Sequence, residues 1–558
     1  MPQKPVFARA PLIKCPHAFL SNGMIRTGDS RVESLYRKSS EYIEAPCVWE
    51  GLFRLACLIR KDPLKEPVAD RILRAIQDNE EGSFQGSIFS QICIARAAFS
   101  VYQYNTDRKI LRRLASWLRY VEINFDQLSG QDGLLFRPAD LMEFLVCYYQ
   151  VTGLRSVLRL CTLLRASSFD WTTTLHTFQQ SVSRNESDTG DFSFQLFPSP
   201  AAIGFDDRQK LINHAELLAD GVRYTLFSGL FSGNGQELKA GFTIWQYLQK
   251  HHRALCGGTT ADPFLCGEAP DKPVFHSALT AWTEAFASLM LTHEYSWAAD
   301  ELIRIIFNGL DDCLNHDIRS DRQLINQIIP PHDTGCEKVY IYGRLTRAVS
   351  CAFHHAVTIT PKGIRINYLL PCKMILAINQ QTIVLHMDEH SVHFENEHAV
   401  AAGIDLFVSR TETADISAVI DHRKVQILNG PADHAETGFF LHTNQPLHSG
   451  DGFHVVQHNR FVTENTHHHG VCFFVRNRLM ALPVSDPFHP IAFFGSTVCE
   501  DGSLLIELHS VEPWKKDGHG DIPVLPPETQ GEQYQVRLEP YSNVIRRVTM
   551  FPRGAEHA

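Results

Sequence analysis

The densest group of chemistry-bearing side chains lies in a polar stretch between two helical patterns, HHRALCGGTTADPFLCGEAPDKPVFHS, residues 251–277. Its side chains include the carboxylates of Asp262 and Glu268 and the imidazoles of His252 and His276. A glycine-rich loop that brings acids to the mouth of a helical cleft suits a general acid, because burial there raises the pKa of a carboxyl group. The other interpretation is that these carboxylates cap the following helix or face water. Asp262 and Glu268 are therefore the first candidates for acid chemistry.

Two further positions offer polar or aromatic groups at the start of helical patterns. In RPADLMEF, Asp140 and Glu143 lie three residues apart, which places both on one helix face, and Arg137 precedes them. A carboxylate in a first turn is also favoured by the helix dipole, so Asp140 has a structural explanation as well. Trp49 is a candidate for stacking on a ligand ring, although packing in the core is the more frequent role of tryptophan.

The composition excludes several classes of partner. The chain has 558 residues with Lys+Arg 52 and Asp+Glu 62, which gives a formal net charge of −10. This charge has the wrong sign for nucleic acid, and no segment concentrates Lys and Arg as phosphate binding requires. No apolar run approaches the roughly 18 residues that span a bilayer, and the first residues do not resemble a signal peptide. We therefore expect a cytoplasmic protein without a membrane partner, whose 14 cysteines are mostly reduced, buried thiols.

The elements that must position these residues are helices up to about residue 360. Apolar residues recur there at i, i+3, i+4 and i+7, and several helices are joined as hairpins at glycine-containing turns. About a dozen helices of roughly 30 residues each, loops included, fit this length. These features favour an (α/α)6 toroid of nested hairpins. The clearest helical segments are 49–61, 90–104, 109–125, 139–153, 277–291 and 297–310.

From Gly363 onward the apolar pattern changes to a period of two, in short runs rich in β-branched and aromatic residues between turn signals. Regular spacing of such strands predicts an antiparallel β-sandwich. The fold class is thus multidomain α+β. We expect an N-terminal segment at 1–40, the toroid as the catalytic domain at 41–360, and one or more β-sandwich domains at 361–558.

Several local strings of this chain resemble the β-L-arabinofuranosidase group, glycoside hydrolase family 127 and its relatives. They include EAPCVWEGLFRLACLIRK, FRPADLMEFLVCYYQVTG, NHAELLADGVRYTLFSG and LEPYSNVIRRVTMFP. The matches follow the family's order from about residue 40 to 552. The resemblance implies a helical toroid followed by β-sandwich, and a sugar as the ligand.

The resemblance also reveals a departure from the family. Members with the family's established mechanism hold zinc through one Glu and three Cys, and one of these thiolates is the nucleophile. At the Glu-x-Cys position this chain has Phe275 and Ser277, and only Cys336, beside Glu337, lies where paired cysteines are expected. One thiol cannot hold Zn²⁺, which takes three or four ligands, so we expect no metal and no other cofactor. Cys336 stays a candidate nucleophile if a neighbouring base lowers its pKa.

The resemblance implies a glycoside hydrolase-like enzyme that acts on a small oligosaccharide or glycoside, an arabinofuranoside among them. Without zinc, it would cleave the glycosidic bond by carboxylate acid/base chemistry, with Asp262 and Glu268 as the acid candidates. The residues expected to bind the sugar are Asp140, His214, His252, His276 and Trp49. Asp140 and His214 are assigned by resemblance, and His214 has a helix cap as its alternative role.

A second interpretation belongs to another class, a non-catalytic carbohydrate-binding or scaffold protein that kept the fold and lost the chemistry. The replacement of the zinc ligands by Phe275 and Ser277 favours it directly. Elimination at the sugar ring is a third option, which needs a Tyr, His or Lys base that the sequence does not place. The sequence leaves open whether the chain is a monomer or a homo-oligomer.

Overall fold

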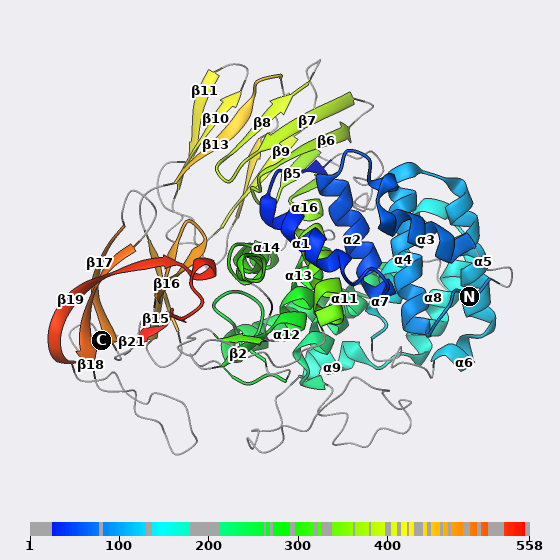
Figure 1. Ribbon diagram of the computed structural model, residues 1–558, viewed down its shortest axis with the longest axis horizontal. Coiled ribbons are helices and arrows are strands. Elements are labelled where there is room, and N and C mark those ends of the chain that lie inside the picture. The colour runs from blue at the N-terminus through cyan, green and yellow to red at the C-terminus, as the bar shows by residue number, and fades with distance from the viewer. Residues whose placement is uncertain are drawn as a thin grey trace.

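The computed structural model combines a helical region with β-sheets that follow it in the chain (Figure 1). The helices end at His355 in α16, and the next strand, β4, begins at Val357. The residues that the structure describes are 25–77, 82–129, 137–178, 212–261, 264–267, 272–290, 296–316, 318, 322–324, 338–360, 363–378, 381–396, 403–409, 414–420, 423–428, 439–443, 448–457, 461–466, 470–483, 491–498, 504–511 and 529–552.

The helices lie where the apolar period predicts them. All six of the clearest predicted segments are helical, with bounds that shift by a few residues, and a π-helical turn, Ile305–Leu310, continues the last of these helices. The helices are α1 Ser30–Ser40, α2 Pro46–Ile59, α3 Pro67–Gln77, α4 Ile88–Asn105, α5 Arg108–Ile123, α6 Phe125–Ser129, α7 Ala139–Thr152, α8 Arg155–Ser167, α9 Trp171–Thr177, α11 Ala215–Ser232, α12 Gly235–His251, α13 His276–Met290, α14 Ser296–Arg304, α15 Asp311–Asn315 and α16 Lys338–His355.

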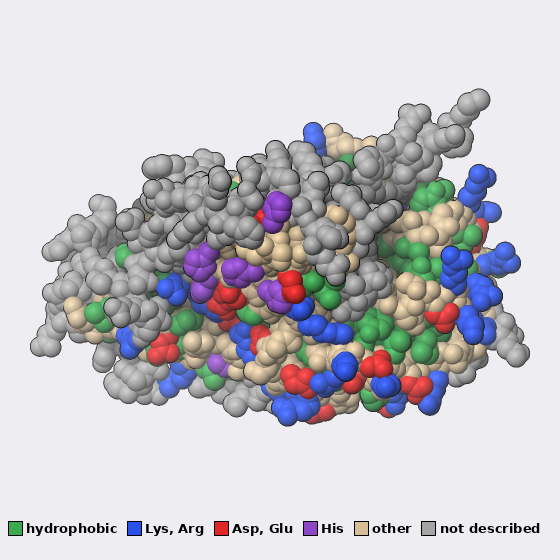
Figure 2. Space-filling model, turned by 90° about the horizontal axis from the view of Figure 1, so that it is seen from above, with side chains coloured by type: hydrophobic (Ala, Val, Ile, Leu, Met, Phe, Trp, Pro, Cys, Tyr) green, Lys and Arg blue, Asp and Glu red, His purple; other side chains and the backbone are tan. Residues whose placement is uncertain are grey.

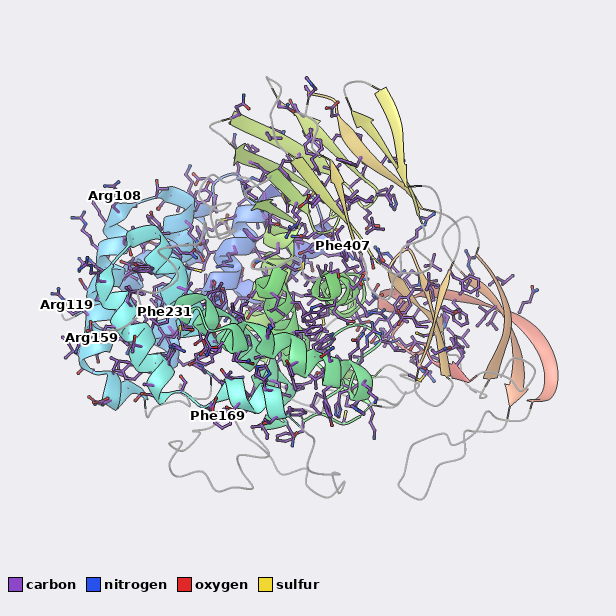
Figure 3. All side chains as sticks on the ribbon, turned by 180° about the vertical axis from the view of Figure 1, so that it is seen from behind. Arg108, Arg119, Arg159, Phe169, Phe231 and Phe407 are labelled. Atoms are coloured by element: carbon purple, nitrogen blue, oxygen red, sulfur yellow. The ribbon has the colours of Figure 1, made fainter. Side chains whose placement is uncertain are left out.

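Alternate helices along the chain contact one another in a closed circuit. Each of α2, α4, α7, α11, α13 and α16 packs against the next, and α16 returns to α2. Of the helices between them, α5 packs against α4 and α12 against α11, and α8 contacts both α7 and α11. The sequences of the helices explain which of them belong to the circuit and which pack outside it. Every residue of α13, in the circuit, is buried, whereas α5, outside it, is apolar on one face only. Arg108 and Arg119 of α5 accordingly project outward, as does Arg159 of α8 (Figure 3).

Small residues allow α2 and α16 to approach closely within this circuit. A Cβ atom on Gly343 would lie 2.9 Å from the carbonyl oxygen of Cys47, and one on Gly51 would collide with the Thr346 side chain. Glycine at both positions removes these clashes. The close contact brings Arg347 of α16 to 3.6 Å from Glu50 of α2.

The strands follow the predicted period of two and form the β-region. They are β1 Ile25–Arg26, β2 Pro273–Phe275, β3 Arg322–Leu324, β4 Val357–Thr360, β5 Gly363–Ile366, β6 Cys372–Ile378, β7 Gln381–Met387, β8 Ser391–Glu395, β9 Gly403–Val408, β10 Ala414–Ile420, β11 Arg423–Leu428, β12 Phe439–Thr443, β13 Gly452–Gln457, β14 Val462–Asn465, β15 Gly470–Val475, β16 Arg478–Pro483, β17 Ile491–Val498, β18 Leu504–Val511, β19 Thr529–Pro540, β20 Arg547–Val548 and β21 Phe551–Pro552.

Three sheets contain nearly all of these strands. Their orders are β1-β6-β7-β8-β13-β10-β11, then β12-β9-β5-β4, then β14-β15-β16-β19-β18-β17 with β20 and β21 at its side. The pairs are antiparallel, as predicted, except that β5 and β9 run parallel. A parallel pair needs a long crossover, and β6, β7 and β8 of the first sheet supply it. The last sheet has an apolar cluster of its own, which includes Val471, Phe473 and Leu504.

Exposed and buried side chains alternate along the strands of the first sheet, as the period of two predicts. His386, His393 and His454 are exposed on β7, β8 and β13, and their sequence neighbours Leu385, Val392 and Phe453 are buried. Figure 2 shows histidines gathered on the face of the molecule seen from above.

Within the part of the chain that the structure describes, no helix has both the length and the apolar character needed to cross a bilayer.

Candidate functional site

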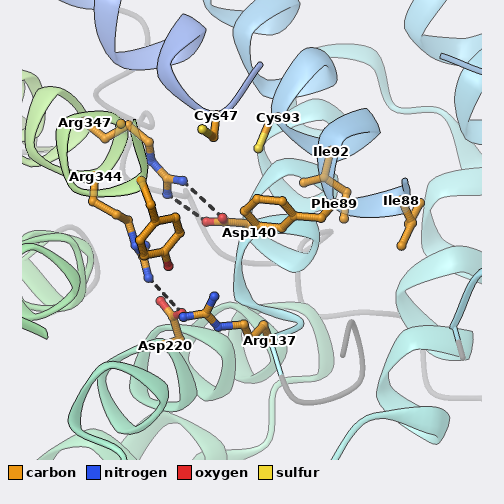
Figure 4. A pocket seen from close by; sticks show the side chains of 12 residues that line it. Cys47, Ile88, Phe89, Ile92, Cys93, Arg137, Asp140, Asp220, Arg344 and Arg347 are labelled. Atoms are coloured by element: carbon orange, nitrogen blue, oxygen red, sulfur yellow. Dashed lines mark hydrogen bonds and ion pairs between the residues drawn. The ribbon is translucent and has the colours of Figure 1, made fainter. Parts of the chain in front are cut away.

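A pocket lies against the helical circuit, and its wall comes from α2, α4, α7, α11 and α16 (Figure 4). It holds about 600 Å³ of empty space, part of which is open to solvent. One side, here called the charged wall, consists of Arg137, Asp140, Asp220, Tyr340, Arg344 and Arg347. The apolar wall is formed by Ile88, Phe89 and Ile92 of α4, and Cys47, Cys93 and Gly343 complete the lining.

Asp140, in the first turn of α7, is the centre of the charged wall. Arg347 of α16 donates to both of its carboxylate oxygens, at 3.1 and 2.8 Å, and Arg223 of α11 donates to it as well. Arg96 of α4 approaches the same carboxylate at 3.3 Å. Burial alone raises the pKa of Asp140, but the charges of Arg347, Arg223 and Arg96 outweigh it and hold that pKa well below its usual value. Asp140 is therefore an ionised acceptor at neutral pH.

Arg344 organises the other half of the charged wall. Its guanidinium donates to Glu216, to Asp220 at 3.0 Å and to Glu284 at 3.2 Å. Arg137 and the Tyr340 hydroxyl also donate to Glu216, so one carboxylate oxygen collects four donors. Burial raises the pKa of Glu216, yet the charges of Arg137 and Arg344 dominate and lower it. This arrangement fixes the rotamers of the groups that face the pocket.

These contacts belong to one buried set of charges, here called the pocket network. Arg96 links Glu50 at 2.7 Å to Glu143 at 3.0 Å, and Arg223 joins Glu284 to Asp140. The network has equal numbers of cations and anions, which lets it remain charged inside the protein. Its members are Arg54, Arg96, Arg137, Arg223, Arg344, Arg347, Glu50, Asp140, Glu143, Glu216, Asp220 and Glu284.

His214 lies beside this network at the N-terminal end of α11. Its ring packs edge-on against Phe264 and Phe275, with ring centroids 5.5 and 6.3 Å away. Burial lowers the pKa of His214 to about 4, so the imidazole is neutral at pH 7. Of the predicted sugar-binding residues, Asp140 belongs to the pocket network and His214 lies beside it. The binding roles of both residues stay predictions.

The predicted acid loop is anchored through His252. The backbone N–H of Gly267 donates to His252 Nδ1 at 3.0 Å, and Thr260 donates to the carbonyl oxygens of both His252 and Gly267. His252 is 1% exposed, and burial lowers its pKa to about 4. These contacts hold the two sides of the loop together. Asp262, Glu268 and Cys336 themselves lie outside the described residues, so their roles stay predictions.

His276 and Trp49 are placed in the helical packing. His276 begins α13 and is buried. Trp49 is 6% exposed, and its indole N–H donates to the carbonyl oxygen of Ile43 at 2.7 Å. Neither belongs to the pocket lining in the described part of the chain.

Sequence reasoning passed over most of the charged wall. Arg344 and Arg347 of α16, Arg223 of α11, and Phe89 of α4 were not candidates. For Arg223 a signal was available, because it lies in a strongly apolar helix and a buried guanidinium needs carboxylate partners elsewhere in the fold.

The family's zinc ligands do not fit this chain. Phe275 and Ser277 are both buried at the junction of β2 and α13, and the Phe275 ring fills the space next to His214. A phenyl ring offers no metal ligand, and a lone serine hydroxyl is not among the usual ligands of zinc. Among residues with a described position, no group of three or more His, Cys, Asp or Glu side chains is arranged to hold a metal ion.

Comparison with known proteins supports the fold. No family model and no curated protein matches the chain. Among solved structures, one described as a glycoside hydrolase has a TM-score of 0.68 at 12% identity and covers 95% of this chain and 97% of its own. A GH127 β-L-arabinofuranosidase from Geobacillus stearothermophilus T6 has a TM-score of 0.63 at 14% identity, with 98% of this chain and 95% of its own covered.

A further GH127 β-arabinofuranosidase has a TM-score of 0.63 at 12% identity and covers 94% of this chain and 92% of its own. The expected resemblance to this family is therefore confirmed at the level of the fold, over nearly the whole chain. The low identities fit a divergent sequence on a shared fold.

Proposed function

We propose that this protein is a glycosidase-like enzyme that binds a small saccharide or glycoside in the pocket and cleaves it without zinc. The observation that supports this most is the pocket itself, a charged wall of preset arginine and aspartate groups inside a fold shared with glycoside hydrolases. The closed circuit of α2, α4, α7, α11, α13 and α16 supports the inner ring of an (α/α)6 toroid.

The charged wall suits sugar hydroxyls. A hydroxyl both donates and accepts, and the ion pair of Arg347 with Asp140 presents an acceptor and donors side by side. The pair of Arg344 with Asp220 repeats this arrangement. Because the pocket network already holds these side chains, a ligand would not have to order them, which reduces the entropic cost of binding.

The acid and base steps are assigned to the loop rather than to Asp140. A general acid must carry a proton near neutral pH, and a good general base needs a pKa close to the working pH. Asp140 meets neither requirement, because three arginines hold its pKa well below the usual value. Asp262 and Glu268 are therefore proposed as the acid and its partner carboxylate, with Asp140, His214 and His252 as binding groups. Cys336 is the alternative nucleophile.

Hydrolysis of a panel of glycosides tests this function. The panel contains aryl glycosides and short arabino-, galacto- and gluco-oligosaccharides, and it is assayed with wild type, Asp262→Asn and Glu268→Gln. We expect at least one substrate to be cleaved and each variant to lose about 100-fold or more in rate. Glu395→Gln, at an exposed position on β8, is the matched control and should keep full activity. Undiminished hydrolysis in both loop variants would remove the acid assignment.

A non-catalytic saccharide-binding protein is the second candidate. One observation in its favour is that both carboxylates of the charged wall are held in ion pairs, Asp140 with Arg347 and Asp220 with Arg344. The other is that Phe275 and Ser277 occupy the positions that the resemblance assigns to the family's zinc ligands. Calorimetric titration separates the two functions. Binding of a panel saccharide without turnover, and loss of that binding in Asp140→Asn, would assign the second function in place of the first.

A further inference from the structure

The apolar wall occupies the first turns of α4. Ser87 caps this helix by accepting the backbone N–H of Ser90 at 3.4 Å, and the next residues, Ile88 and Phe89, turn toward the pocket. Ile92 follows one turn later, at the spacing that places it beside Ile88 on the same helix face. Figure 4 shows all three on the side of the pocket away from Arg344 and Arg347.

Phe89 differs from its two neighbours. Ile88 and Ile92 are 0% and 3% exposed and belong to the main hydrophobic core. Phe89 is only half-buried, and among the described residues it is not part of that core. Its ring therefore lines the pocket without being needed to fill the space between helices.

The contrast between the two walls constrains the ligand. The charged wall can accept and donate hydrogen bonds, whereas the side chains of Ile88, Phe89 and Ile92 can do neither. A hydroxyl placed against them would lose its water without gaining a partner, at a large cost in binding.

We propose that the preferred ligand is a glycoside with an apolar aglycone, an aromatic or branched alkyl group that rests on Phe89 while the sugar hydroxyls face Asp140 and Arg347. This inference rests on the proposed function and narrows it from saccharides in general to one class of glycoside. A second sugar unit is disfavoured in this half of the pocket because it would present hydroxyls to the Phe89 ring, the most exposed side chain of the apolar wall.

Calorimetric titration with matched thioglycosides, which resist hydrolysis, tests the inference. The probes are methyl and phenyl 1-thio-β-L-arabinofuranoside, the corresponding galacto and gluco pairs, and a disaccharide of each sugar. For the sugar that binds, we expect wild type to hold the phenyl compound about tenfold or more tighter than the methyl compound and the disaccharide. Phe89→Ala should abolish this ratio and leave methyl binding within about twofold, and Phe89→Trp should restore the ratio.

Phe242→Ala is the matched control, since Phe242 is 41% exposed on α12 and lies away from the pocket lining. It should keep the wild-type ratio. Equal binding of methyl, phenyl and disaccharide probes, or a ratio unchanged by Phe89→Ala, would overturn this inference and leave the proposed function intact. If none of the probes binds, the proposed function fails, and this inference fails with it.

Discussion

Two clusters of buried arginines and carboxylates can be compared in this molecule, and one of them borders the pocket described above. The first is the pocket network of the helical circuit. The second, here called the interface cluster, joins α15 to the last sheet through Asp311, Asp312, Arg478, Arg547 and Ser542. Both contain the same residue types, so the presence of buried ion pairs does not by itself indicate a functional site.

The difference lies in what surrounds the arginines. Arg547 donates to Asp312 at 2.6 Å, to the carbonyl oxygens of Tyr541 and Val544, and to the Tyr541 hydroxyl at 2.7 Å, and it lies 3.6 Å from the centre of the Tyr541 ring. Its partners enclose it fully. Arg344 and Arg347, in contrast, have an open face toward the pocket. A cluster that borders empty space can receive a ligand, whereas the enclosed interface cluster joins α15 to the last sheet.

The number of cations per carboxylate also differs. Asp140 is shared by three arginines, and their charges outweigh its burial and lower its pKa. Asp312 is paired with one arginine, Arg547, and with His316 at 3.7 Å, and there burial outweighs these partners and raises its pKa. The comparison shows that burial and pairing compete, and that several cations around one buried carboxylate can outweigh its burial.

The largest expected effect is the loss of Arg344. Arg344→Ala removes the group that links Glu216, Asp220 and Glu284, and it leaves buried carboxylates without compensation. We expect the free energy of unfolding to fall by about 3–5 kcal/mol, as for other broken buried ion pairs. Urea denaturation followed by tryptophan fluorescence measures it. A loss below about 1 kcal/mol would show that the pocket network does not depend on this residue.

A smaller effect is expected for Arg547 of the interface cluster. In Arg547→Ala, Asp312 can take up a proton, because its pKa is already raised, so the buried charge disappears with its partner. We expect a loss of about 2–3 kcal/mol, mostly from the unpaired carbonyl groups. Hydrogen exchange should show it in the last sheet, and calorimetric titration should show unchanged saccharide binding. Weakened binding in this variant would contradict the functional difference between the two clusters.

The two buried, neutral histidines predict a pH effect on stability of roughly 3 kcal/mol each. Burial lowers the pKa of His214 and His252 to about 4, from 6.5 in the unfolded chain. The unfolded state therefore binds more protons between these values, so the contribution to stability is complete above pH 6.5 and is lost as the pH falls toward 4. Denaturation of His214→Gln should show a shallower loss over this window. An identical pH dependence in wild type and variant would rule out His214 as a source.

The smallest effect is expected at the edge of the interface cluster. Arg478 is 23% exposed and pairs with Asp311 at 2.9 Å and Glu389 at 3.1 Å. Arg478→Ala should cost less than about 1 kcal/mol, because partly exposed pairs are screened and Ser542 still donates to Asp311. Thermal denaturation measures the difference. A loss as large as that of Arg547→Ala would mean that both arginines act as one unit.

The sequence predicted the elements much better than the site. Periodicity identified α4, α5, α7 and α13 because the apolar residues that each helix buries recur at helical spacing within its own sequence. It could not indicate that Ile25 and Arg26 pair with β6, since two residues have no period and their partners lie about 350 positions away.

The site was harder because its contacts are long-range. Asp140 was a candidate through the family resemblance, but its partners Arg223 and Arg347 lie 83 and 207 positions away in the chain. In the sequence of α16, two arginines three residues apart look like an ordinary polar face. They are buried only because α2, α7, α11 and α13 together supply the carboxylates, and no local pattern contains that information.

The most direct test of the central claim is a crystal structure of the protein with a saccharide from the glycoside panel. The claim predicts the sugar ring in the pocket, with hydroxyls about 2.6–3.2 Å from the carboxylate of Asp140 and the guanidinium of Arg347. A saccharide bound elsewhere on the molecule, with the pocket between the charged and apolar walls containing only solvent, would contradict it.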